Sequence, residues 1–414
     1  MREVRKIGAA LALVIMALGG TCNAADEQDF SLIERGRYLT IAADCAACHT
    51  MPGSGKPFAG GRPIETPFGT LLAPNITSDR DTGIGAWTGK EFISALKGGI
   101  GHGGTRLYPA MPYVYYTKMP DADVLAIWAY LQTLKPIRNA VEPNQLPFPF
   151  NIRASLIFWN WLYLQPGDWK PVPGKSPEWN RGAYLVEGPM HCGACHTPKS
   201  LLGGDLSSHK FQGYSIQGWH APNITNSKEL GVGSWAADQI VEYLKTGHNN
   251  TASASGPMAE EVELASQLMS GEDLKAVAAY LKDQGAPAVK TGTPIATSDP
   301  VMKAGQAIYA DNCSACHRED GRGVPELFPA LRDAPAVRAP DALSLIRVVV
   351  DGAKSASTEG APTGPGMPSY AWQLNDDQIA AVLTYVRNSW GNAAGAVLKS
   401  DVQSAKPSFA RMAN

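Results

Sequence analysis

Two cysteines three positions apart and followed directly by a histidine occur three times in this 414-residue chain. The pattern is typical of covalent haem attachment, because each thiol can add to one vinyl group of a porphyrin and the histidine can then ligate the iron. A ring fixed in this way constrains the fold strongly, since the chain must wrap around it. The three motifs are Cys45-Ala46-Ala47-Cys48-His49, Cys192-Gly193-Ala194-Cys195-His196 and Cys313-Ser314-Ala315-Cys316-His317.

The alternatives to haem attachment are a zinc site and a thiol–disulfide pair, which are the commoner roles of a lone CxxC. A zinc site would combine two pairs close in sequence, whereas these pairs are separated by 147 and 121 residues. A redox pair has no need of the histidine. The sequence therefore predicts three covalently attached haem c groups, held by Cys45, Cys48, Cys192, Cys195, Cys313 and Cys316.

The N-terminus has the pattern of a secretory signal peptide over residues 1–24. Basic residues at 2–6 are followed by an apolar run at 7–18 and a small-residue end at Ala24. The run is about 12 residues long, and a membrane-spanning helix needs ~20. Without Cys22, six cysteines remain, and all lie in the three motifs. We expect an exported chain, and the net charge of −2 gives no basic field for nucleic acid.

A helical segment precedes each motif, and a second helix follows each motif much later in the chain. The first helix carries a glycine, and the last carries a tyrosine flanked by aliphatic residues. We predict that the glycine allows close packing of the last helix, which closes each unit around its ring. The predicted first helices include 35–39, 181–185 and 305–309, and the predicted last helices span 121–134, 271–282 and 375–387.

Each unit resembles a small all-helical cytochrome c domain, with the attachment motif after the first helix and a methionine loop before the last. The resemblance implies an all-α fold of three tandem domains with long irregular loops around each haem, and 42 glycines and 31 prolines suit such loops. The predicted divisions are a signal peptide at 1–24, domain 1 at 28–137, an aromatic connector at 138–177, domain 2 at 178–284, a linker at 285–300, domain 3 at 301–391 and a tail at 392–414.

The second axial ligand in that family is a methionine. His102 and His248 are competing ligands, since they lie 9 and 10 residues before Met111 and Met258. A bis-histidine haem would have a lower potential. Methionine is favoured because all three units share a Pro/Gly-Met segment and the third has no such histidine. The predicted iron ligands are therefore His49, Met111, His196, Met258, His317 and Met367.

The first two units share a second block, Ala-Pro-Asn-Ile-Thr, at residues 73–77 and 221–225, which the third unit lacks. A tryptophan follows each copy at Trp87 and Trp235. We interpret these blocks as haem-edge loops whose tryptophans could cover the ring or bind its propionates. The alternative is that the tryptophans are packing aromatics of a duplicated domain.

The connector between the first two units has an intensely apolar and aromatic centre, residues 156–164. It is too short to span a bilayer, so it either packs between domains or lies at a membrane or partner surface. The remaining histidines of this half, His191, His209 and His220, are expected in surface or loop positions. We find no chemistry in the tail that follows Trp390.

Histidine and methionine together leave iron no open coordination position, so the predicted ligand set favours electron transfer. The chain after the signal peptide resembles the three-haem cytochrome c subunit of membrane-bound dehydrogenases of acetic acid bacteria and related proteobacteria. The resemblance rests on the three motifs, the two Ala-Pro-Asn-Ile-Thr blocks, the connector and the methionine loops. These dehydrogenases oxidise alcohols, gluconate, sorbitol, fructose or aldehydes.

The resemblance implies an electron-transfer subunit that does not itself act on the substrate. Its partner would be a catalytic dehydrogenase subunit, which is a quinoprotein, a flavoprotein or a molybdenum hydroxylase. Its electron acceptor would be ubiquinone, and it would associate peripherally with the periplasmic face of the inner membrane. The alternative is a free-standing periplasmic multihaem carrier that delivers electrons to a terminal oxidase.

Overall fold

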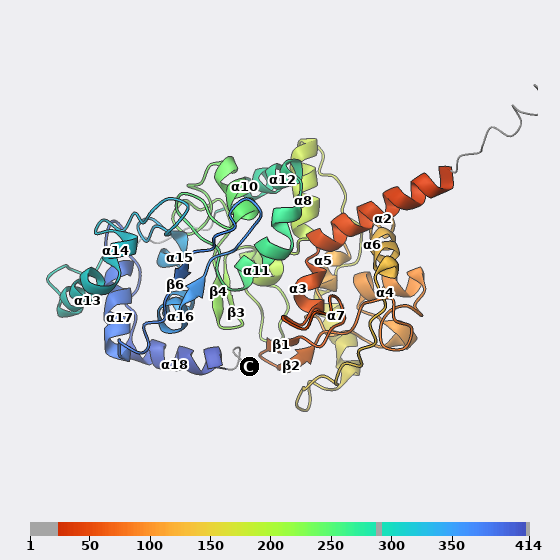
Figure 1. Ribbon diagram of the computed structural model, residues 1–414, viewed down its shortest axis with the longest axis horizontal. Coiled ribbons are helices and arrows are strands. Elements are labelled where there is room, and N and C mark those ends of the chain that lie inside the picture. Colours follow the sequence, from red (N-terminus) through yellow and green to blue (C-terminus); the bar gives the residue numbers. More distant parts are fainter. Residues whose placement is uncertain (1–23, 287–291, 411–414) are drawn as a thin grey trace, which may run out of the picture.

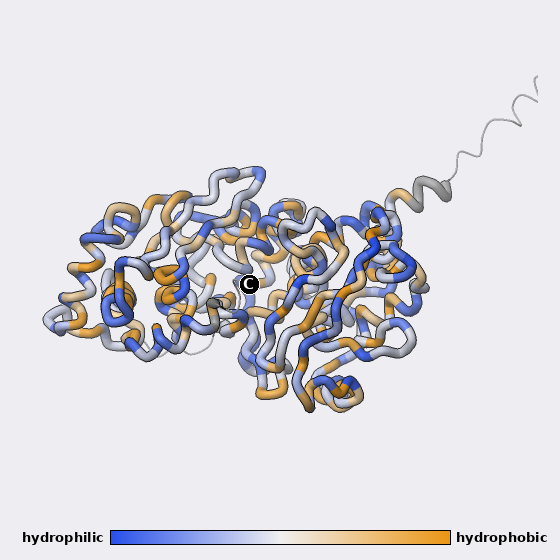
Figure 2. The backbone as a smooth tube through the Cα atoms, turned by 60° about the horizontal axis from the view of Figure 1, so that its bottom comes forward, coloured by the Kyte–Doolittle hydropathy of each residue, from blue (hydrophilic) through white to orange (hydrophobic). Residues whose placement is uncertain are grey.

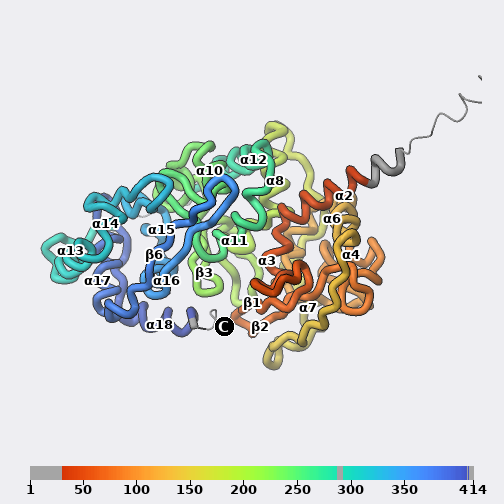
Figure 3. Tube along the Cα trace, viewed as in Figure 1, coloured from red at the N-terminus to blue at the C-terminus, as the bar shows by residue number. Residues whose placement is uncertain are grey.

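The computed structural model describes residues 24–286 and 292–410. The predicted signal peptide, with Cys22, lies outside the described residues apart from Ala24, and the predicted linker is described only in part. Three helical units follow one another along the longest axis of the molecule (Figure 1). The colour order in Figure 3 runs from the N-terminal end through the middle unit to the C-terminal unit. The all-α class is confirmed.

The three units, which we call repeats 1, 2 and 3, have corresponding helices. Repeat 1 contains α2 (Ala24–Ala42), α3 (Cys45–His49), α4 (Gly89–Gly98), α5 (Tyr113–Tyr116) and α6 (Asp121–Thr133). Repeat 2 contains α8 (Pro177–Glu187), α9 (Gly193–His196), α10 (Ala237–Thr246), α11 (Pro257–Leu264) and α12 (Gly271–Lys282). Repeat 3 contains α13 (Pro300–Asn312), α14 (Ser314–His317), α15 (Pro335–Arg338), α16 (Leu343–Asp351) and α17 (Asp376–Arg387). Helix α7 (Leu156–Tyr163) joins repeats 1 and 2, and α18 (Lys399–Ala410) follows repeat 3.

Small antiparallel hairpins interrupt the loops of each repeat. Each hairpin has two strands, and the first two precede the proline of an Ala-Pro-Asn-Ile-Thr block. Four short 3-10 turns lie at His102–Gly104, Arg153–Ser155, Ser207–His209 and Ser266–Leu268. The strand pairs are β1 (Pro63–Thr66) with β2 (Gly69–Leu72), β3 (Tyr214–Ile216) with β4 (Trp219–Ala221), and β5 (Ala353–Lys354) with β6 (Gly366–Met367).

The first and last helices of each repeat pack together at the predicted glycine. A Cβ atom added at Gly36 would lie 1.9 Å from the carbonyl oxygen of Ala126, and one added at Gly182 would lie 1.9 Å from that of Ala276. Gly305 faces α17 in the same way. The predicted contact with the tyrosine of the last helix is confirmed, since these added atoms would lie 2.9 Å, 3.0 Å and 2.6 Å from the Cβ atoms of Tyr130, Tyr280 and Tyr385.

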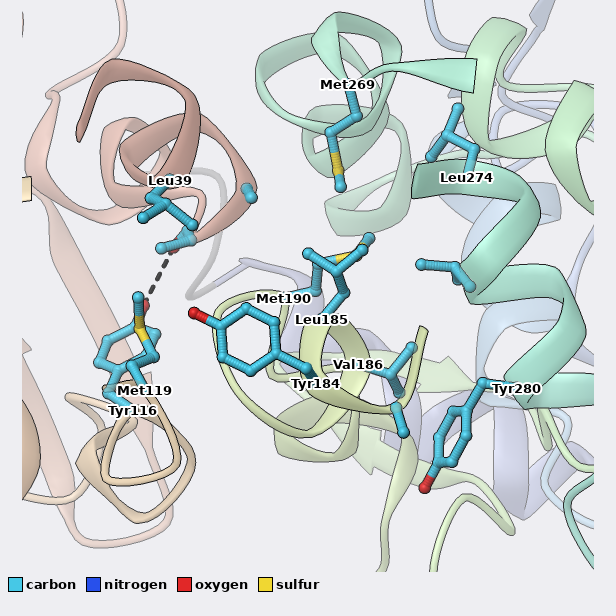
Figure 4. Close-up of a cluster of buried hydrophobic side chains, with 14 of the residues drawn as sticks. Leu39, Tyr116, Met119, Tyr184, Leu185, Val186, Met190, Met269, Leu274 and Tyr280 are labelled. Carbon is cyan, nitrogen blue, oxygen red and sulfur yellow. Dashed lines mark hydrogen bonds between the residues drawn. The ribbon is translucent and has the colours of Figure 1, made fainter. Parts of the chain in front are cut away.

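Repeats 1 and 2 share one hydrophobic core, whereas repeat 3 has a core of its own. Figure 4 shows this shared core, with Leu39 and Met119 of repeat 1 on one side and Leu185 and Met190 of repeat 2 on the other. The hydroxyl of Tyr116 donates a hydrogen bond to the carbonyl oxygen of Ala43, which ties α5 to the end of α2 (Figure 4). Burial of this shared surface makes the first two repeats one packed body.

Two equivalent polar contacts cross the boundary between repeats 1 and 2. The Tyr38 hydroxyl of α2 donates to Asp273 of α12 at 2.6 Å. In return, the Tyr184 hydroxyl of α8 donates to Asp123 of α6. Each aspartate is also paired with an arginine of its own repeat: Arg35 with Asp123 and Arg181 with Asp273. These reciprocal tyrosine–aspartate contacts relate repeats 1 and 2 by an approximate twofold axis, as expected when two copies of one domain pack against each other.

The C-terminal helix α18 has a structural role that the sequence did not reveal. It packs against α16 and α17, and its Val402 and Phe409 side chains are buried. The guanidinium of Arg347 lies between the rings of Trp219 and Phe409, 4.9 Å and 5.0 Å from their centres. These stacked contacts hold repeat 3 and the tail against the β3–β4 hairpin of repeat 2.

No helix within residues 24–286 and 292–410 is both long enough and apolar enough to cross a membrane. Hydrophobic and hydrophilic stretches alternate along the described chain (Figure 2).

Candidate haem sites

The three attachment motifs line one connected cavity of about 2240 Å³. This exceeds the ~300–1,000 Å³ of a pocket for a single small ligand. All six motif cysteines and the three motif histidines lie on its wall. We call the surroundings of His49 site 1, those of His196 site 2 and those of His317 site 3.

Each motif histidine is held in the orientation that an iron ligand needs. The Nδ1–H group of His49 donates to the carbonyl oxygen of Pro74 at 2.7 Å. That of His196 donates to Pro222 at 2.6 Å, and that of His317 donates to Pro329 at 3.0 Å. Such a bond fixes the tautomer in which Nε2 carries a free lone pair. Burial also lowers the pKa of all three imidazoles, to about 4 for His196, which keeps this lone pair available near neutral pH.

The Ala-Pro-Asn-Ile-Thr block supplies the proline carbonyl in the first two sites. Within the block, the Oδ1 atom of Asn75 accepts hydrogen bonds from the backbone N–H and the hydroxyl of Thr77, at 2.9 Å and 2.8 Å. Asn223 and Thr225 make the same turn in repeat 2. The asparagine therefore fixes the loop whose preceding proline orients the histidine. The repeated block is visible in the sequence, but its residue types do not indicate that the proline carbonyl accepts the hydrogen bond from the histidine.

The three predicted methionines all line the cavity, although their local structures differ. Met111 lies in the loop before α5, Met258 is the second residue of α11, and Met367 belongs to β6. Met119, Met190 and Met269 are buried in the shared core, and of these three only Met190 also lines the cavity. The cavity wall thus carries the three motif imidazoles and the three predicted methionine thioethers, which are the donors that suit a six-coordinate haem iron.

The two competing histidines do not line the cavity. The side chain of His102 is 57% exposed, bonds to Glu91 through Nδ1 at 2.7 Å and stacks on Trp87. His248 is buried in the loop before α11, and its Nδ1 has no hydrogen-bond partner. Neither placement favours histidine over methionine.

The two tryptophans that follow the shared blocks, Trp87 and Trp235, lie on the cavity wall and also pack against the shared core. Their positions suit both of the roles that we considered, covering a ring and packing.

The zinc alternative has no counterpart in the described ranges, where no group of three or more His, Cys, Asp or Glu side chains is placed to hold a metal ion. The thiols lie in apolar surroundings. Burial raises the pKa of Cys45 and of Cys48 to about 12, with smaller contributions from neighbouring negative charges. Such thiols stay protonated at neutral pH, which does not favour thiolate coordination of a metal.

The three histidines outside these assignments have different environments. His209 lies in a short 3-10 turn at the surface, as expected. His191 lies in the loop between α8 and α9, as expected, and packs against Tyr115 and Tyr116 of repeat 1 with ring centres 6.5 Å and 5.6 Å away. It also lines the cavity, as does His220, whose Nδ1 bonds to Ser215 at 2.9 Å. Burial lowers the pKa of His191 to about 4, so it is neutral there.

The sequence profile of the cytochrome c family matches residues 33–135 and 302–390, which correspond to repeats 1 and 3. Curated relatives align along nearly the whole chain. The gluconate 2-dehydrogenase cytochrome c subunit of Pantoea cypripedii is 38% identical, over 95% of this chain and 94% of its own length. The cytochrome c subunit of the alcohol dehydrogenase (quinone) of Gluconobacter oxydans is 36% identical, over 97% and 87%. The fructose dehydrogenase cytochrome subunit of Gluconobacter japonicus is 36% identical, over 96% and 88%.

Proposed function

Because this chain belongs to the cytochrome c family, among the cytochrome subunits of gluconate, alcohol and fructose dehydrogenases, we propose that it passes electrons from a catalytic dehydrogenase subunit through three haems to ubiquinone. The observation that carries the proposal is the single cavity lined by all three attachment motifs. One continuous cavity would bring three redox groups together on one polypeptide, which a relay requires and a single-haem carrier does not.

Bound haem would supply reversible one-electron chemistry at iron. The chain's part is to attach the ring through two thioethers at each site, to orient the imidazole through a proline carbonyl and to present a methionine sulfur. With these two ligands in place and an apolar wall around the ring, the chain would exclude water and small ligands from the iron. The proposed ligands are His49 and Met111 at site 1, His196 and Met258 at site 2, and His317 and Met367 at site 3.

We also propose that the three repeats are three cytochrome c domains with boundaries at 28–137, 178–284 and 301–391. The packing of α2 on α6, of α8 on α12 and of α13 on α17 supports these limits. The segment 138–177 carries α7 and connects the first two domains.

The proposed partner is a catalytic subunit that oxidises the substrate on the periplasmic side of the inner membrane. Ubiquinone takes up two electrons and two protons to become ubiquinol, so each turnover uses two one-electron transfers through the chain. The test is reduction of a short-chain ubiquinone analogue by the purified complex, with the haem absorbance followed at the same time. Haems that cycle while the quinone stays oxidised would show that the acceptor is not ubiquinone.

Helix α7 supports peripheral membrane association, because its two faces have different environments. Leu156 and Trp159 are buried against Tyr113 of repeat 1, so one face packs inward. On the other face Phe158 is 59% exposed and Trp161 is 76% exposed. An amphipathic helix with exposed aromatic side chains is suited to the boundary between lipid headgroups and acyl chains.

Neighbouring loops extend this apolar surface. Phe148 is 79% exposed, and Leu201 is 98% exposed. The indole N–H of Trp159 donates to the carbonyl oxygen of Leu202 at 2.8 Å, which holds the loop of repeat 2 beside α7. The connector thus packs between the two repeats, and its exposed apolar face supports the proposal that it also lies at a membrane surface.

Membrane docking through α7 can be tested with the double variant Phe158→Ser/Trp161→Ser of the mature holoprotein. Removing two exposed aromatic side chains should weaken co-sedimentation with anionic phospholipid vesicles by at least about tenfold, since burying one such side chain contributes about 1.5–3 kcal/mol. The matched control is Trp372→Ser, because Trp372 is 80% exposed on repeat 3. Equal vesicle binding by the double variant and the control would show that α7 is not the docking face.

A further inference from the structure

The attachment helix of each of the first two repeats contacts the methionine segment of the other repeat. Helix α3, which carries the site 1 motif, packs against α11, which carries Met258. In the opposite direction, the site 2 motif meets α5, which follows Met111. A Cβ atom added at Gly193 would lie 2.7 Å from the hydroxyl oxygen of Tyr115. The approximate twofold relation between repeats 1 and 2 therefore also relates the surroundings of site 1 to those of site 2.

A charged pair closes the contact between α3 and α11. The guanidinium of Arg62 binds both carboxylate oxygens of Glu260, one of them at 2.8 Å. The same guanidinium donates to the carbonyl oxygen of Ala47, inside the site 1 motif. Both partners are mostly buried, with 27% and 30% of their side chains exposed. Arg62 thus joins the haem-attachment helix of site 1 directly to the methionine helix of site 2.

The contact between α9 and α5 has an equivalent polar link. The Lys199 ammonium donates to the carbonyl oxygen of Gly193, inside the site 2 motif, at 3.0 Å. It also pairs with Asp205, whose other carboxylate oxygen accepts a hydrogen bond from Tyr115 of repeat 1. In both links, a cation bonded to the backbone of an attachment motif reaches the other repeat, directly or through a carboxylate.

Helix α11 also contacts repeat 3, through a different side chain. The backbone N–H of Ser357 donates to Glu263 at 2.7 Å, and the hydroxyl oxygens of Ser253 and Ser355 are 2.6 Å apart. Site 2 therefore lies between the other two sites, and the charged contact with repeat 1 is separate from the hydrogen bonds to repeat 3.

We propose that Arg62 and Glu260 are positioning residues for electron exchange between site 1 and site 2. The inference rests on the proposed function, since it presumes haem at both sites. In the step itself, one electron leaves the iron of one site and enters the iron of the other, with no bond formed and no proton moved. The ion pair holds the attachment helix of site 1 against the methionine helix of site 2 and balances the charge between them.

The surroundings of the pair explain why its charge balance matters. Asp44 and Glu261 lie beside the same contact, and burial raises the pKa of both carboxyl groups, which favours their neutral forms. One Asp44 carboxylate oxygen is buried without a hydrogen-bond partner. Arg62 lies on the repeat 1 side of this contact, and its positive charge acts on Asp44 and on Cys48. Loss of its charge would leave the Glu260 carboxylate uncompensated next to two redox sites.

The test measures the midpoint potentials of the three haems in Arg62→Gln and Glu260→Gln variants of the full holoprotein. Glu260→Gln leaves the guanidinium unbalanced, which stabilises reduced iron, so the potentials of sites 1 and 2 should shift upward. Arg62→Gln leaves the carboxylate unbalanced, so the same two potentials should shift downward. Site 3 should not change in either variant. If the contact were merely structural, its loss would shift the midpoint potentials in the same direction in both variants. Opposite shifts that are confined to sites 1 and 2 are not expected in that case.

A third variant, Arg62→Lys, separates charge from geometry. Lysine keeps the positive charge, so the potentials should stay near those of the wild type, but it cannot form the two-pronged contact. Electron equilibration between sites 1 and 2 after photoreduction should therefore be slower than in the wild type, since the two helices are no longer held by two parallel hydrogen bonds. Controls for the charge changes are Lys175→Gln and Asp283→Asn, which remove an ion pair away from α11.

Potentials that move in the same direction in both variants, or that do not move at all, would overturn the inference. Unchanged equilibration in Arg62→Lys would overturn the positioning role. Either result leaves the proposed function intact as long as the proteins carry three low-spin haems. A protein without haem at site 1 or site 2 would instead refute the proposed function itself.

Discussion

Alanine at Gly182 would place a Cβ atom 1.9 Å from the carbonyl oxygen and 2.4 Å from the carbonyl carbon of Ala276. A real Cβ atom essentially never comes closer than 3.0 Å to another heavy atom. Helices α8 and α12 would therefore have to separate by about 1 Å, because the obstructing atoms belong to the backbone and cannot rotate away. This change acts directly on the helix contact that closes repeat 2.

The expected cost follows from two opposing contributions. Overpacking a core typically costs about 1–3 kcal/mol. Alanine regains roughly 1 kcal/mol over glycine in a helix interior. Since the clash is between backbone segments, we expect the overpacking cost at or above the top of its range and a net loss of about 2 kcal/mol. If repeats 1 and 2 unfold as one body, the melting temperature should fall by about 4–8 °C.

The assay is thermal unfolding of the mature holoprotein followed by circular dichroism. The matched control is Gly98→Ala in α4, where an added Cβ atom meets nothing within 4 Å, so its melting temperature should be unchanged or slightly higher. Gly36→Ala should behave like the Gly182 variant, and Gly305→Ala, with 2.3 Å to the nearest atom, should be milder. If Gly182→Ala had the same melting temperature as Gly98→Ala, the close-packing explanation for these glycines would be refuted.

Three further predictions concern the sites. Met258→Ala should convert one of the three haems to high spin without loss of attached haem, whereas Met269→Leu in the core should leave all spectra unchanged; lost attachment would instead require another ligand assignment. His102→Ala should also leave the spin states unchanged, and a new high-spin haem would make this histidine the ligand at site 1. Burial raises the pKa of Glu261 to about 7, and the Ser266 hydroxyl opposes this. The folded carboxyl thus holds its proton more tightly than the unfolded one, so this stabilisation is complete below about pH 4.5 and is lost as the pH rises through 7. Glu261→Gln should remove about 3 kcal/mol of this pH dependence, measured as melting temperature between pH 4 and 8; an unchanged pH profile would contradict it.

The sequence predicted the features that are encoded locally. Gly182 and Tyr280 mark the helix contact because close packing requires a residue without a side chain at one place and an aromatic at the other. The last helices were placed correctly, since acidic residues and an apolar pattern define α6, α12 and α17. The spacing of the motifs likewise gave the three repeats.

Contacts between distant segments were not predictable in the same way. Arg62 and Glu260 lie 198 positions apart, and each is an ordinary charged residue in its own segment. Pro74 was visible in a repeated block, but a backbone carbonyl has no side-chain signature for its acceptor role. The loop position of His191 was expected, but an isolated histidine gives no sign of the two tyrosines of another repeat against which it packs. Helix α18 buries Val402 and Phe409 in a segment whose composition is mostly polar.

The proposed electron relay depends most directly on three six-coordinate haems in one chain. The decisive measurement is the haem content of the purified mature protein, from its intact mass under denaturing conditions, together with its electron paramagnetic resonance spectrum in the oxidised state. For the proposed relay we expect an intact mass that includes three covalently bound haems, and a spectrum with three low-spin signals and no high-spin signal. Fewer than three attached haems, or a stable high-spin signal in the unmodified protein, would contradict it.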